Sequence, residues 1–150
     1  MDEHISDLSA SANQVMFALK TLQRSGLNDA MIWRVCQATL VSKLLYGCSA
    51  WWGFANKSQI DCVEGIIRRA TRWNLYPENG PSILAMVEKP DNKLFNTILT
   101  NKQHVTQKRL APVKITPYNL RDKAHDRILP LKTFTLSKNF IHRVLYSDMH

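Results

Sequence analysis

The segment from Ala38 to Phe54, ATLVSKLLYGCSAWWGF, restricts the fold more than any other part of this 150-residue chain. It belongs to a longer helical pattern that begins near Asp29, and its apolar or small residues recur at steps of three and four. At about 100° per residue these positions form two neighbouring stripes, which together cover more than half of the helix surface. The stripes consist of Trp33, Cys36, Leu40, Leu44, Gly47 and Trp51, and of Val41, Leu45, Cys48 and Trp52. A helix that is apolar on nearly every side is buried among other elements, so the sequence predicts the core helix of an all-α unit.

An amphipathic helix is predicted to precede this core helix. Residues 5–25 carry an apolar stripe on one side, and Gly26 suits the left-handed residue that ends a helix. The members of the stripe are Ile5, Leu8, Ala12, Val15, Leu19 and Leu22. Asn28 is the expected N-cap of the core helix, which should then continue to Gly53.

A third helix is predicted over residues 57–74. It follows Asn56 and Gln59, whose spacing resembles a capping box. Its apolar positions are Ile60, Val63, Ile67 and Ala70, with Ile66 and Trp73 beside them. Because the connections are short, consecutive helices should be antiparallel, and residues 1–75 are predicted to form a three-helix antiparallel bundle.

Residues 76–150 have a less regular helical pattern than residues 1–75. The turn cluster PENGP ends the third helix, and prolines break the periodicity of residues 101–131. Short helices are expected at residues 82–87, 91–100 (capped by Asp91) and 137–147, with one helical turn near residues 122–126. Their apolar side chains are Leu94, Phe95, Ile98, Leu99, Phe140, Val144 and Leu145. The second region is therefore predicted to be an irregular C-terminal extension with short helices.

The charge of the chain is concentrated in its last third. The net charge is +8, and residues 101–150 contribute ten basic and three acidic side chains. A concentration of this kind is expected where a protein faces a polyanion, although an ordinary solvated surface explains it equally well.

Composition also predicts an intracellular protein, nuclear or cytoplasmic. No apolar run reaches the roughly 20 residues that a membrane span needs, so no membrane partner is expected. The first residues, MDEHISDLSA, lack the basic start and apolar stretch of a signal peptide. The three cysteines, Cys36, Cys48 and Cys62, lie in helical patterns without CxxC spacing and are expected to be buried, reduced thiols.

No sequence motif in the chain indicates an active site. A glycine-rich phosphate loop, HExxH, GxSxG and paired aspartates are all missing from the sequence, and its histidines have no metal-ligand spacing. We therefore expect no catalytic residue, no metal site and no cofactor in this chain, which leaves binding as its function.

Two basic clusters are the candidate binding residues. The third helix carries Arg68, Arg69 and Arg72 on the side away from its apolar stripe, where they would contact phosphates. The alternative is a solvated helix face on which Glu64 pairs with Arg68. The second cluster interleaves basic residues with Tyr118 and prolines, as in proteins that contact an irregular strand of nucleic acid. Its candidates are Lys108, Arg109, Arg121, Lys123 and Arg127. The alternative for this cluster is an ordinary surface loop clamped onto the bundle.

The order of several motifs resembles one polymerase family. These motifs are SKLLYGCSAWWGF, RRATRW, DNKLFNTILTNKQHV, YNLRDKAHDRILP and NFIHRVLY, and they extend over nearly the whole chain. In this order they resemble the region after the palm domain in reverse transcriptases of non-LTR retrotransposons, most closely those of jockey-like elements. The palm aspartates that bind magnesium in this family have no counterpart in the chain.

The resemblance implies a C-terminal fragment of an RNA-directed DNA polymerase, with a thumb that holds the template–primer duplex and is not itself catalytic. It implies RNA, DNA or an RNA–DNA hybrid as partner, together with the palm and fingers domains of the parent protein. Magnesium is expected only in that parent polymerase. The alternative is a helical protein-interaction module or an inactive remnant of a degenerate element.

Overall fold

The computed structural model describes residues 1–113, 127–131 and 133–147. Over these residues the chain is mostly helical and contains no β-strand, which confirms the predicted all-α class. The only β-type contact among them is an isolated antiparallel bridge between Val113 and Arg127. None of the helices described combines the length and the apolar character that crossing a bilayer requires.

The chain divides into two compact units, Met1–Val87 and Glu88–His150. The sequence places a boundary between residues 75 and 76, but the first hydrophobic core also includes Leu75, Tyr76, Ile83, Met86 and Val87. The PENGP turn is mostly exposed but is attached to this core, because the Tyr76 hydroxyl donates a hydrogen bond to the Pro81 carbonyl at 2.6 Å. Gly80 lies against the Tyr76 ring, where a Cβ atom would come within 2.2 Å of the ring carbon Cε1.

Helix α1 (Asp2–Arg24) forms one side of the first unit. It ends as predicted, with Gly26 at φ +92°. The Leu27 amide donates to the Leu22 carbonyl and the Gly26 amide donates to the Gln23 carbonyl, which is the Schellman pattern. The buried residues of α1 are Ile5, Leu8, Ala12, Met16 and Leu19. Met16, rather than Val15, therefore occupies the centre of the stripe, and Leu22 is exposed.

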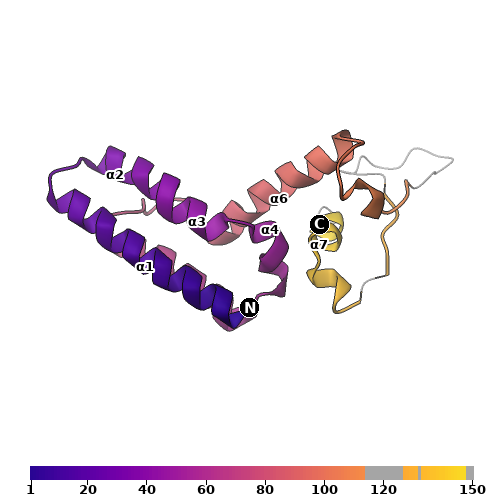
Figure 1. Ribbon diagram of the computed structural model, residues 1–150, viewed down its shortest axis with the longest axis horizontal. Coiled ribbons are helices and arrows are strands. Elements are labelled where there is room, and N and C mark those ends of the chain that lie inside the picture. The colour runs from indigo at the N-terminus through magenta and orange to yellow at the C-terminus, as the bar shows by residue number, and fades with distance from the viewer. Residues whose placement is uncertain (114–126, 132, 148–150) are drawn as a thin grey trace. The chain divides into compact units, whose positions relative to one another are not determined.

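The predicted core helix is continuous only to Leu45. It consists of α2 (Asp29–Cys36), the π-helical turn η1 (Gln37–Val41) and α3 (Ser42–Leu45), and the Asn28 side chain caps it as expected by accepting from the Met31 amide at 2.9 Å. Its buried residues are Ile32, Cys36, Leu40 and Leu44. It runs alongside α1 in the opposite direction (Figure 1).

The prediction that this helix continues to Gly53 is wrong. Tyr46 is extended and Gly47 is left-handed at φ +61°, so the helix stops before the aromatic segment. The chain then forms α4 (Cys48–Trp51) and the 3₁₀ turn η2 (Trp52–Phe54). The Trp51 indole donates to the Tyr46 carbonyl at 3.1 Å, and this bond holds the turn against the helix end.

The core helix is also less enclosed than its composition suggests. Ala38, Thr39, Ser42 and Lys43 are exposed, and Tyr46 is 83% exposed. The small and polar residues of this side therefore face outward. The buried residues pack into the core, with the half-buried Trp33, Val35, Val41 and Leu45 against it.

Helix α5 (Lys57–Arg72) begins with the predicted capping box. The Gln59 amide donates to the Asn56 side chain at 2.9 Å, and the Asn56 amide donates to the Gln59 side chain at 2.8 Å. Asn74, at φ +56°, ends the helix in the left-handed conformation. Val63, Ile66 and Ala70 are its buried apolar residues, whereas Ile60 and Ile67, which were expected to be central, are only half-buried at its edge.

Helix α6 (Ile83–Thr100) replaces the two short helices predicted for this region. It continues through Pro90, although a proline inside a helix removes one backbone hydrogen bond and costs about 3 kcal/mol. Its packing offsets this cost, since Met86 and Val87 belong to the first core and Phe95 and Ile98 to the second. The unit boundary falls inside this helix.

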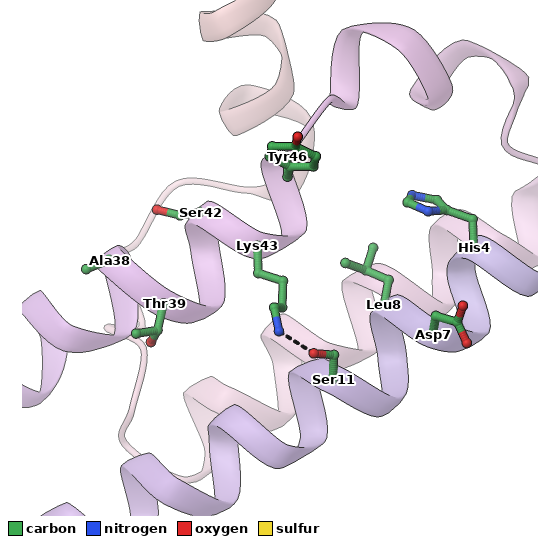
Figure 2. Close-up of a pocket in the computed structure, with 9 residues that line it drawn as sticks. All are labelled: His4, Asp7, Leu8, Ser11, Ala38, Thr39, Ser42, Lys43 and Tyr46. Carbon is green, nitrogen blue, oxygen red and sulfur yellow. Dashed lines mark hydrogen bonds between the residues drawn. The ribbon is translucent and has the colours of Figure 1, made fainter.

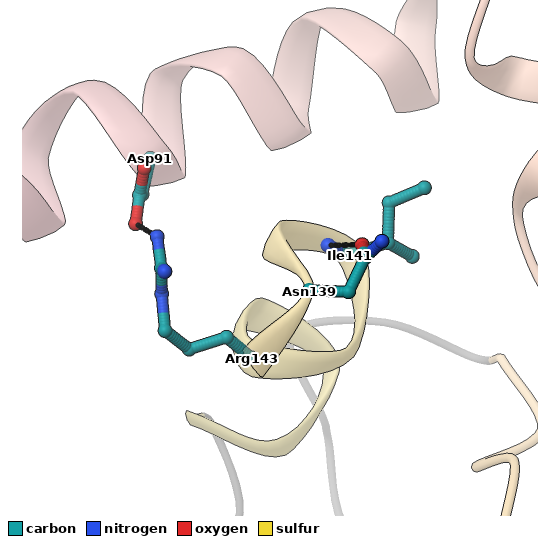
Figure 3. A network of polar contacts seen from close by, with 4 residues as sticks. All are labelled: Asp91, Asn139, Ile141 and Arg143. Carbon is teal, nitrogen blue, oxygen red and sulfur yellow. Dashed lines mark hydrogen bonds and ion pairs between the residues drawn. The ribbon is translucent and has the colours of Figure 1, made fainter. Parts of the chain in front are cut away.

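The second unit is built from the end of α6, the 3₁₀ turns η3 (Gln107–Arg109) and η4 (Leu136–Lys138), and α7 (Phe140–Ser147). Its core contains Phe95, Ile98, Leu110, Val144 and Leu145, with Phe140 packed against it. Asp91 does not cap a helix as predicted, because it lies within α6 and accepts a charge-assisted hydrogen bond from Arg143 of α7 (Figure 3). The helical turn predicted near residues 122–126 lies outside the described residues.

Candidate nucleic-acid interface

Helices α1 and α5 lie side by side and run in the same direction. Three contacts along their length set this register. The Gln59 side-chain amide donates to the Asp2 carboxylate at 2.6 Å, near the start of both helices. The Arg69 guanidinium donates to the Asn13 side-chain carbonyl at 2.7 Å. At the far end, the Lys20 ammonium lies 4.3 Å from the centroid of the Trp73 ring.

This shared direction separates the charges of the two helices. The acidic residues Asp2, Glu3, Asp7, Asp61 and Glu64 lie in the N-terminal halves. All the basic residues except Lys57 lie toward the C-terminal ends, and we call this set the α1/α5 basic surface: Lys20, Arg24, Arg68, Arg69 and Arg72. Cations near helix C-termini also complement the helix dipole, so the arrangement stabilises the helices as well as attracting anions.

The three arginines of α5 differ in how they are held. Arg68 lies 3.6 Å from the Glu64 carboxylate, but their side chains are 67% and 41% exposed. An exposed pair of this kind contributes little to stability and exchanges readily with another anion. Arg69 is held by Asn13 of α1, and Arg72 is exposed. The predicted Glu64 pairing is thus present and leaves the arginines accessible.

A glycine lies at the centre of the arginine face. At about 100° per residue, Arg68 and Arg69 define the edges of an arc, with Arg72 and Gly65 between them. A Cβ atom on Gly65 would lie 3.7 Å from a terminal guanidinium nitrogen of Arg68, which is an ordinary contact. Without a side chain of its own, Gly65 leaves a half-buried stretch of helix backbone between the arginines.

Two members of the surface were not found from the sequence. Lys20 and Arg24 belong to a second stripe on α1 with Asn13 and Phe17, at steps of four, three and four. This spacing was visible in the sequence. Its meaning depends on which flank of α1 lies against α5, and no local pattern indicates this flank.

The second predicted cluster is only partly described. Lys108 and Arg109 are exposed in η3 of the second unit. Arg127 is half-buried and donates to the Ala111 carbonyl at 3.0 Å, so it contacts another segment of the second unit and not the three-helix region. Arg121 and Lys123 lie outside the described residues.

The described residues offer no metal site, since no group of three or more His, Cys, Asp or Glu side chains converges among them. Cys36 and Cys48 are buried as predicted, whereas Cys62 is exposed. Burial raises the pKa of the Cys36 thiol to about 11, so at neutral pH it stays protonated and unreactive.

A groove of about 470 Å³ lies between α1 and the η1–α3 segment, on the exposed side of the core helix (Figure 2). Leu8 and Ala38 line it, and Lys43 crosses it to contact the Ser11 hydroxyl. Tyr46 stands at one end of the groove.

Comparison with protein families, with curated proteins and with solved structures finds no match for this chain.

Proposed function

We propose that this chain binds nucleic acid as the thumb and adjoining C-terminal region of an RNA-directed DNA polymerase of the non-LTR retrotransposon type. In this proposal α1, the α2–η1–α3 helix and α5 form an up-down-up, three-helix antiparallel bundle that acts as the thumb. The α1/α5 basic surface holds the template–primer duplex, whether RNA, DNA or a hybrid. The palm and fingers of the parent polymerase supply the catalytic residues and bind magnesium.

The α1/α5 basic surface is the observation that carries the proposal. Its charges belong to regular helices fixed by contacts between α1 and α5, so they form a preorganised set. Phosphates are recognised by such exposed Arg and Lys side chains, which position a duplex without reading its bases. The motif resemblance supports the polymerase assignment independently.

A titration of a labelled RNA–DNA hybrid at two salt concentrations tests the proposal. Each phosphate contact on duplex DNA contributes about 0.9 to the slope of log affinity against log salt. Replacing Arg68, Arg69 and Arg72 with Gln should lower the slope by up to about 2.7, and affinity for every sequence should fall alike. Wild-type affinity from these contacts should itself fall about 40-fold between ~50 and ~200 mM salt.

Lys57→Gln is the matched control, because Lys57 is an exposed cation on the same helix at its acidic end. It should leave the slope nearly unchanged. Equal affinities for the wild type and the triple variant would show that the arginines form only a solvated face.

A second candidate function is that of a helical protein-interaction module. The groove between α1 and η1–α3, with its exposed Tyr46, favours this alternative. A protein-docking surface would give no salt-sensitive affinity for the hybrid, so the same titration separates the two functions.

A further inference from the structure

Phe17 is a large apolar side chain in an unusual place. It lies in the middle of α1 and is 71% exposed. Helix α1 buries the stripe that contains Met16 and Leu19, so Phe17 contributes little to the core. An isolated exposed apolar residue needs no special explanation, but the neighbours of this one are specific.

Those neighbours belong to the α1/α5 basic surface. Phe17 follows Asn13 by four residues and precedes Lys20 by three, so all three side chains share one flank of the helix. Asn13 accepts the hydrogen bond from Arg69, and Lys20 lies over Trp73. The exposed phenyl ring therefore stands on the α1 side of the cationic surface, between two residues that contact α5.

Aromatic side chains within basic surfaces are the arrangement that binds unpaired nucleotides. Cations hold the phosphates, while an exposed ring stacks on a base through its face, whatever the base is. Bases inside an intact duplex are already stacked on one another and are not available to such a ring. An exposed phenyl ring on a cationic surface therefore favours a ligand with unpaired bases over an intact duplex.

We propose that Phe17 stacks on an unpaired base of the nucleic acid that the α1/α5 basic surface holds, a role that rests on the proposed function. The ligand class is a single strand, or the unpaired nucleotide beside a duplex end. The arginines supply the salt-dependent part of the affinity, and Phe17 supplies a part that depends on the presence of bases.

The test compares the full chain with its Phe17→Ala variant on three labelled probes: a single strand of about 12 nucleotides, an abasic strand of the same length, and a blunt hybrid duplex. The abasic strand keeps the phosphates and removes the stacking partner. Phe17→Ala should weaken binding to the single strand by about 5- to 150-fold, without changing its salt slope. Its affinities for the abasic strand and the blunt duplex should stay within about twofold of the wild type.

Tyr46→Ala is the matched control, because Tyr46 is an exposed aromatic residue of the same unit that lies at the groove and outside the basic surface. It should leave all three affinities unchanged. Phe17→Trp should retain the preference for bases, since the indole ring also stacks. The melting temperature of Phe17→Ala should equal that of the wild type, as expected for an exposed side chain.

The outcomes separate this inference from the proposed function. If the wild type binds with steep salt dependence but Phe17→Ala binds the base-containing strand equally well, the stacking role is wrong. The proposal that the α1/α5 basic surface binds nucleic acid is then retained. An equal loss on the abasic strand would also contradict stacking. If the wild type shows no salt-dependent binding to any probe, the proposed function and the stacking role both fail.

Discussion

Gly65 is a half-buried position of α5 at which alanine would make a more stable helix. Its φ angle is ordinary and a Cβ atom there would meet only Arg68, at 3.7 Å. Nothing in the folded protein therefore requires glycine at this position. A glycine between arginines is explained if a ligand comes close to the helix backbone.

Gly65→Ala should raise the free energy of unfolding by about 0.5–1 kcal/mol, because it removes backbone freedom from the unfolded chain. If the arginine face holds a duplex, the same change should weaken hybrid binding, since the new methyl group occupies the approach path. Thermal unfolding and the hybrid titration measure the two effects separately. A more stable variant with unchanged affinity for the hybrid would show that the duplex does not come close to the α5 backbone at Gly65.

Cysteine reactivity gives a second check at the scale of single residues. With a pKa of about 11, the Cys36 thiol is protonated at pH 8, and its burial also blocks reagents. Cys48 is likewise buried, whereas Cys62 is exposed on α5. Native protein at pH 8 should therefore react rapidly with a thiol reagent at one cysteine only, and Cys62→Ser should abolish this fast phase. Fast labelling of the Cys62→Ser variant would contradict the described core.

At the scale of elements, the π turn η1 explains how the core helix keeps its buried stripe. Ile32, Cys36, Leu40 and Leu44 are spaced by four residues at every step. In an α-helix each step of four overshoots a full turn by about 40°, so three steps would rotate the stripe by about 120°. A π turn accommodates one extra residue and removes most of this rotation. The side chains thus stay on the face toward the core.

Deleting Thr39, an exposed residue of η1, should therefore be tolerated. The buried residues would then be spaced by four, three and four, which is the spacing of one face of an ordinary α-helix. Circular dichroism and thermal unfolding should show retained helix and cooperative melting. Deletion of Ala10 is the control, because it would rotate Ala12, Met16 and Leu19 by about 100° away from Ile5 and should disrupt the core. Equal disruption by both deletions would contradict the role of the π turn.

These elements also show which features the sequence could predict. The caps at Gly26, Asn28 and Asn56 depend on local hydrogen bonds, and all of them formed as predicted. The stop at Gly47 is a left-handed glycine that a longer apolar pattern on both sides concealed, and the passage of α6 through Pro90 depends on the packing of its two ends. Local preference alone argues against a helix through Pro90, and there the tertiary contacts outweigh it.

The residues of the candidate site also include some that the sequence predicted and some that it did not. Arg68, Arg69 and Arg72 were identified from their positions on one helix, and the structure leaves Arg68 and Arg72 exposed. Lys20 and Phe17 were missed, because their significance depends on which flank of α1 lies against α5. The shared direction of α1 and α5 follows from the two chain reversals between them, but the flank on which the helices meet is decided by their side-chain contacts.

For the whole molecule, the positive charge is divided unevenly between the two units. Residues 1–87 carry eight basic and seven acidic side chains, a net charge of +1. Residues 88–150 carry twelve and five, a net charge of +7. The ordered α1/α5 basic surface therefore belongs to a nearly neutral unit, while the second unit carries most of the excess positive charge. Local arrangement should govern binding by the first unit, and net charge should govern long-range attraction by the second.

The two contributions can be separated with a chain that ends at residue 87. It retains the complete first hydrophobic core, so circular dichroism should show a helical, cooperatively melting protein. If α1 and α5 form the interface, this shorter chain should still bind the hybrid. Its affinity should be lower and its salt slope smaller than those of the full chain, because the cations beyond residue 87 no longer release counterions. The Arg68, Arg69 and Arg72 triple variant of the shorter chain should then lose most of the remaining slope. A folded shorter chain without hybrid binding, beside a full chain that binds, would move the interface to residues 88–150 and contradict the assignment to α5.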